Sequence, residues 1–148
     1  MRGKRGQSLV ELAVAMPVVM VLLMGIADLS FVLYAFIQVT AATGQGARAG
    51  ALYPGDLTQS LATNDANRAT VVEEAVSNSL GMLPVGSPYF SATTDVQISY
   101  PNHTGPTSRV GEDMLVTVTY RQPIWFTVLP GTGSGSYQVS SSTTVRIQ

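Results

Sequence analysis

The sequence predicts an α+β protein in which a long N-terminal transmembrane helix extends into a small exported domain. That domain is expected to hold one further helix and a three- to four-stranded antiparallel sheet. Three observations support this: a long apolar opening stretch, a middle segment with helical spacing, and a second half that alternates apolar and polar residues. We expect residues 1–6 to form a leader, 7–52 the long helix with a membrane span at about 9–39, and 53–148 the exported domain.

Composition and charge exclude several classes of protein. Only 11% of the 148 residues are charged, against about 25% in a typical soluble domain. The chain has no cysteine, which rules out disulfides and thiolate metal sites. After the first six residues five Arg face nine Asp and Glu, a balance of −4. The basic patch typical of nucleic-acid binding is missing, so we expect no nucleic acid partner.

The opening stretch is long enough to cross a bilayer. Sixteen uncharged residues separate Glu11 from Asp28, and a second apolar run reaches Val39, whereas a span needs about 20 residues. Basic residues precede the span, which places the N-terminus in the cytoplasm and the rest outside. A cleavable signal peptide is the alternative, but its apolar region would be about 7–15 residues long. Pro17 removes a backbone bond to Ala13, and we expect it to kink the helix or alternatively to be merely tolerated there.

The predicted helix is about twice as long as the membrane is thick. From Ser8 to Leu52 it would measure about 65 Å, and the hydrocarbon core measures about 30 Å. In the projecting half, Ala42, Gly46 and Gly50 recur every four residues, a pattern that lets helices approach closely. The alternative is that these glycines fray the helix end, because each costs about 1 kcal/mol within a helix.

Glu11 requires an explanation, because a carboxylate in a membrane costs several kcal/mol unless it is paired or solvated. In one interpretation it reaches into the interfacial region. In the other it belongs to a motif, since the basic leader ends in Arg5-Gly6 and the acid follows five positions later. This motif resembles the prepilin cleavage site of the type IV filament superfamily.

The resemblance is closest to TadE-like proteins, minor pilins or pseudopilins of the tight-adherence (Tad) pilus. It begins with Arg5-Gly-Gln-Ser-Leu-Val-Glu-Leu-Ala-Val-Ala-Met-Pro17 and continues in Gly25-Ile-Ala-Asp28, Tyr34 and Gly46-Ala-Arg48. A looser likeness ends the chain at Val145-Arg146. Gln45 departs from the pattern, because the family often carries a charged residue there.

The resemblance implies a pilin-like structural subunit, minor or abundant. Because the exported part offers no catalytic constellation, we expect neither enzymatic activity nor a cofactor. A prepilin peptidase would cut between Gly6 and Gln7, and Glu11 would meet the new ammonium of a neighbouring Gln7. The implied partners are other pilin or pseudopilin subunits, the inner-membrane assembly platform and membrane lipid. The implied location is the bacterial inner membrane, as a single-pass protein, or a pilus outside the cell. The alternative functions are an anchored binding or adhesin domain and an anchored enzyme.

Local signals place the elements of the exported part. Tyr53-Pro54-Gly55-Asp56 should end the first helix, and residues 57–63 should form a loop or a short helical turn. Thr63, Asn64 and Asp65 offer caps for a helix over 66–80. Its apolar face would consist of Ala69, Val72, Val76 and Leu80. Alternation predicts strands at about 96–100, 114–120 and 137–147, joined by loops.

The exported part offers little chemistry. His103 lies in a loop of Pro, Asn and Gly, which favours an exposed residue over a ligand. The segment 64–67 lacks the further ligands of a calcium loop, and the glycines at 131–135 precede neither helix nor lysine. Trp125 and Phe126 are expected to pack the sheet on the first helix, or alternatively to contact a subunit or the membrane interface.

Overall fold

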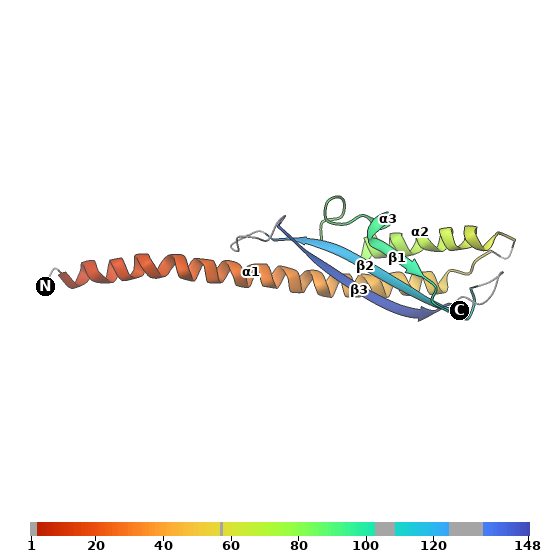
Figure 1. The fold of residues 1–148 in the computed structure, drawn as a ribbon, viewed down its shortest axis with the longest axis horizontal. Coiled ribbons are helices and arrows are strands. Elements are labelled where there is room, and N and C mark those ends of the chain that lie inside the picture. Colours follow the sequence, from red (N-terminus) through yellow and green to blue (C-terminus); the bar gives the residue numbers. More distant parts are fainter. Residues whose placement is uncertain (1–2, 57, 103–108, 125–134) are drawn as a thin grey trace.

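The structure is a computed structural model that describes residues 3–56, 58–102, 109–124 and 135–148. Its elements follow the order α1, α2, α3, β1, β2, β3. Figure 1 shows an elongated molecule in which the first half of α1 stands alone and the second half joins the remaining elements. We call this assembly of the second half of α1 with residues 53–148 the head. Trp125, Phe126, His103 and the glycines at 131 and 133 lie outside the described residues.

Helix α1 runs unbroken from Gly3 to Leu52 and contains Pro17. It ends where the sequence indicates, because Pro54 follows and Gly55 adopts a positive φ of 62°. The first half carries exposed apolar side chains from Leu9 to Leu33. In the second half Ala35, Val39, Ala42 and Ala47 are buried.

The start of the head overlaps the expected membrane span at 9–39. Ala35 and Val39 are fully buried in the core of the head. On the face of α1 that carries Ala35 and Val39, the uncovered part of the helix therefore ends before Ala35.

Helix α2 spans Leu61–Ser79 and begins earlier than the sequence indicates. The predicted start at Ala66 is wrong, because the hydroxyl of Ser60 caps the helix by accepting a hydrogen bond from Thr63 N at 3.2 Å. The expected cap residue Asn64 instead exchanges hydrogen bonds with the backbone of Asp56. The end is close to the predicted one, since Leu80 is the C-cap and Gly81 follows with a φ of 65°.

The sheet contains β1 (Val96–Ser99), β2 (Asp113–Pro123) and β3 (Ser136–Arg146), in the order β1-β2-β3 with both pairs antiparallel. Four alternate side chains of β2 are fully buried, and they are Met114, Val116, Val118 and Tyr120. A short helix not predicted from the sequence, α3 (Ala92–Asp95), leads into β1. The predicted fold class, α+β with a long apolar N-terminal helix and a small antiparallel sheet, is confirmed.

Helix α1 organises the head. Its second half packs against α2, β2 and β3, and Figure 1 shows α2 alongside it with the two long strands crossing it. The two helices run in opposite directions, because Arg68 bonds to the backbone of Gly50 while Gly81 lies against Gln38. The C-terminal end of α2 thus faces back toward the uncovered half of α1.

Candidate functional site

The motif at the start of α1 lies on an uncovered helix. Gly6, Gln7 and Glu11 all fall within α1. The amide Nε2 of Gln7 donates to Oε1 of Glu11 over 3.5 Å, which is a long contact across one helical turn. In the part of the chain that the structure describes, no cation pairs with Glu11. Its carboxylate is therefore available to a group from outside the chain.

Apolar side chains surround this carboxylate. Val10, Val14 and Val18 line a shallow apolar surface next to Glu11, and all three are exposed. The stretch of α1 from Leu9 onward is long and apolar enough to cross a membrane, and its most apolar window is wholly uncovered by the rest of the chain. A long apolar surface of this kind is consistent with a single-pass membrane anchor.

The stripe of small residues faces α2 within the same chain. Ala42, Gly46 and Gly50 are all buried. A Cβ atom on Gly46 would lie 2.5 Å from Cγ2 of Val76, and a Cβ on Gly50 would lie 2.6 Å from Cγ2 of Val72. Gly44, on another side of the helix, has nothing within 4 Å of such an atom. Gly46 and Gly50 thus permit the close approach of α1 and α2.

A cluster of charged side chains holds together the far end of the head, that is, the end where α1 stops and which is most distant from the uncovered half of α1. Arg68, only 3% exposed, lies on α2 and donates from Nε to the carbonyl of Gly50 at 3.1 Å. Nη2 of Arg109 donates to Oδ2 of Asp65 at 2.8 Å, and Nη1 donates to Glu112 at 3.2 Å. These bonds, that to Asp65 first, raise the pKa of the Arg109 guanidinium above its usual value. The cluster joins α1, α2 and the segment before β2.

The role of Arg68 was not predicted from the sequence. The available signal was its spacing, because Arg68 precedes Val72 and Val76 by four and eight residues on the apolar face of α2. A cation at that position must find a buried acceptor. The acceptor belongs to another helix, and the sequence alone does not indicate which one.

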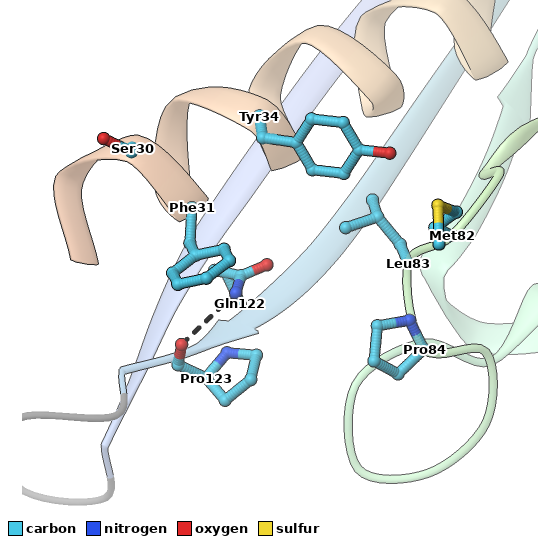
Figure 2. Close-up of a pocket in the computed structure, with 8 residues that line it drawn as sticks. All are labelled: Ser30, Phe31, Tyr34, Met82, Leu83, Pro84, Gln122 and Pro123. Atoms are coloured by element: carbon cyan, nitrogen blue, oxygen red, sulfur yellow. Dashed lines mark hydrogen bonds between the residues drawn. The ribbon is translucent and has the colours of Figure 1, made fainter. Parts of the chain in front are cut away.

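A pocket of about 500 Å³ lies at the opposite end of the head, beside α1. Figure 2 shows its lining: Ser30, Phe31 and Tyr34 from α1, Met82, Leu83 and Pro84 from the segment after α2, and Gln122 and Pro123 from β2. The lining is almost entirely apolar. The Ser30 hydroxyl donates to the carbonyl of Ile26 at 2.8 Å, and Nε2 of Gln122 donates to the carbonyl of Pro123 at 3.3 Å. This junction pocket was not predicted from the sequence.

Among the described residues, no three His, Cys, Asp or Glu side chains are grouped so that they could hold a metal ion. The site with the most distinctive chemistry is therefore the N-terminal half of α1, where one carboxylate interrupts a long apolar surface.

A comparison with protein families decides the identity of this segment. Residues 6–48 match the family described as TadE-like protein. The N-terminal segment is TadE-like. The resemblance inferred from the sequence is thus confirmed over Gly6 to Arg48, which includes Glu11. No curated protein and no solved structure gives a significant match to the chain.

The TadE-like match indicates a protein associated with the Tad pilus, in a family whose members are structural rather than catalytic. The matched segment covers the uncovered half of α1 and continues into the buried stripe at Ala42 and Gly46. The rest of the head, from α2 onward, lies outside the match.

Proposed function

We propose that this chain is a pilin-like structural subunit of a Tad-type pilus, cleaved after Gly6 and assembled through α1. The observation that carries the proposal is the TadE-like segment, in which Gly6 and Glu11 lie at the start of α1 and are followed by an apolar stretch that the head leaves uncovered. A helix of this kind can exchange lipid for the helices of neighbouring subunits, because both surroundings are apolar.

The proposed position in the membrane follows from the charges and from the head. Arg2, Lys4 and Arg5 precede the apolar stretch, which favours a cytoplasmic N-terminus and a head outside the inner membrane. Because Ala35 and Val39 belong to the core of the head, we place the hydrocarbon span at Leu9–Leu29. At about 1.5 Å per residue this segment measures about 30 Å, the thickness of the hydrocarbon core.

The partners follow from the same segment. A prepilin peptidase would cut between Gly6 and Gln7, and the assembly platform and other subunits would receive the processed helix. Cleavage would leave an ammonium on Gln7. The Glu11 carboxylate, which pairs with no cation of its own chain in the described region, would offer a neighbouring subunit's ammonium a counter-charge in an apolar setting.

The mass of the mature protein tests this proposal. The full chain is produced in cells with and without a prepilin peptidase, and intact mass spectrometry measures loss of residues 1–6. We expect loss only with the peptidase, and we expect Gly6→Leu to prevent it. Gly3→Leu is the matched control, since it changes a glycine of the same leader and leaves the cut site intact. An uncut chain in cells with the peptidase would leave the anchored binding domain as the better explanation.

A further inference from the structure

The head has two chemically different ends. The far end carries the ionised cluster of Asp65, Arg68, Arg109 and Glu112. The end that faces the uncovered half of α1 carries the segment 81–90, which has no charged residue. Within that segment the side chains of Met82 and Val85 are 91% and 55% exposed. We call Met82, Val85 and the junction pocket the apolar rim.

The apolar rim continues the apolar surface of α1. Phe31 and Tyr34 line the pocket and are themselves exposed apolar side chains of α1. In Figure 2 the ring of Tyr34 points from α1 toward the segment that carries Met82. Arg121, which follows Tyr120 on β2, pairs within the head with Asp95 at 2.9 Å. Between Leu9 and Tyr34 the described part of α1 carries exposed apolar side chains and only two charged residues, Glu11 and Asp28, of which Asp28 has a partner.

The length of the helix sets the depth at which this rim would lie relative to the bilayer. If the hydrocarbon span begins at Leu9, about 30 Å of helix ends at Leu29. Ser30, Phe31 and Tyr34 then lie within the first turn and a half beyond it, at the level of the lipid headgroups. An aromatic ring with a polar tip, as in Tyr34, is typical of this level. Apolar side chains at such a boundary are buried about 5–10 Å into it.

We propose that the apolar rim is a lipid-binding surface, in which Met82 and Val85 enter the headgroup layer on the side of the head and the junction pocket receives the ester-linked end of a phospholipid acyl chain. The head then rests on the bilayer before assembly, and its charged end points away. This inference rests on the proposed membrane anchor but not on cleavage or on incorporation into a filament.

Site-specific fluorescence tests it in the full, uncleaved chain. Because the chain has no cysteine, Met82→Cys, Val19→Cys and Leu52→Cys each give one labelling position. All three native side chains are exposed, so the changes should leave the fold intact, and thermal unfolding followed by circular dichroism verifies this. The labelled proteins are placed in phosphatidylcholine vesicles whose acyl chains carry bromine either near the headgroup or near the methyl end.

We expect the label at position 82 to lose emission with bromine near the headgroup and much less with bromine near the methyl end. The label at position 19 should respond more to the deep bromine. The label at position 52, about 35 Å along the helix from Leu29, should respond to neither.

The other outcomes separate this inference from the proposed function. Quenching at position 19 but not at position 82 would overturn the lipid-binding surface and leave the anchor in place. The double variant Phe31→Cys, Met82→Cys would then show, by disulfide formation between chains, whether a second copy fills the pocket instead. Absence of quenching at position 19 would remove the anchor and with it both proposals.

Discussion

Nε of Arg68 on α2 donates a hydrogen bond to the carbonyl oxygen of Gly50 on α1, over 3.1 Å. Gly50 lies in the last turn of α1, where carbonyl groups have no partner within the helix, and besides Arg68 its carbonyl has only a long hydrogen bond of 3.4 Å from Tyr53 N among the described residues. That turn contains no basic residue of its own. Arg68 therefore supplies both a donor and a positive charge to the negative end of a helix to which it does not belong.

Loss of this contact should destabilise the head. Arg68→Met removes a buried donor from the Gly50 carbonyl and a partner from Asp65, and we expect a loss of about 2–3 kcal/mol in the free energy of unfolding. Urea unfolding of the full chain in detergent measures it. Arg48→Met is the control, because Arg48 is exposed on α1 and should change the value by less than about 0.5 kcal/mol. Equal midpoints for the two variants would contradict the role of Arg68.

The glycines of α1 should respond differently to alanine. A Cβ on Gly46 would overlap Cγ2 of Val76, a branched side chain with one preferred rotamer in a helix. We expect Gly46→Ala to destabilise the head by about 1–3 kcal/mol, less the gain in helix propensity. Gly44→Ala meets nothing and should stabilise the helix by up to about 1 kcal/mol. The unfolding midpoints should move in opposite directions, and a shared direction would argue against close packing at Gly46.

The turn after α1 should weaken in acid. Hydrogen bonds from the hydroxyl and then the amide of Thr58 lower the pKa of the Asp56 carboxyl from 3.8. Because the folded pKa lies below the unfolded one, the contribution to stability is complete above about 3.8 and is lost as the pH falls through the folded value. Carbon NMR titration of the carboxyl measures this. Thr58→Val should raise the pKa of Asp56, and an unchanged titration would show that the Thr58 hydroxyl does not lower it.

Glu11→Ala should separate insertion from assembly. The variant removes the carboxylate from an otherwise apolar surface, so we expect it to reach the membrane fraction as the natural chain does. The fraction of cells that carry pili, counted by electron microscopy, should fall to near zero. Glu74→Ala removes an exposed acid of the head instead and should leave piliation normal. Normal piliation with Glu11→Ala would rule out the pairing with a neighbouring subunit.

The parts of the fold that depend on local signals could be predicted. The end of α1 depends on Pro54 and Gly55, and the buried face of β2 depends on strict alternation between Met114 and Tyr120. The start of α2 was misplaced because Thr63, Asn64 and Asp65 are residue types that suit a helix N-cap as well as Ser60 does. In the structure Ser60 is the cap, and Asn64 lies inside α2 and bonds to the backbone of Asp56, a contact that the sequence does not indicate.

The contacts between distant segments could not be predicted. Ala35 and Val39 are apolar residues that suit a lipid environment and a protein core equally, and only the placement of the head assigns them to the core. The junction pocket combines Phe31, Leu83 and Pro123, which lie far apart in the sequence. Gly6 and Glu11 were found through a family pattern, which specifies chemistry rather than packing.

The unbroken course of α1 from Gly3 to Leu52 has a mechanical consequence. The described helix is continuous, with Pro17 within it, between the end that would lie in the bilayer and the end held by Arg68. A force applied to the head along the helix axis would reach Glu11 through the helix itself, because the helix is continuous between them. Withdrawal of the anchor from lipid would therefore displace the head along the same axis, because no loop separates the two in the described helix.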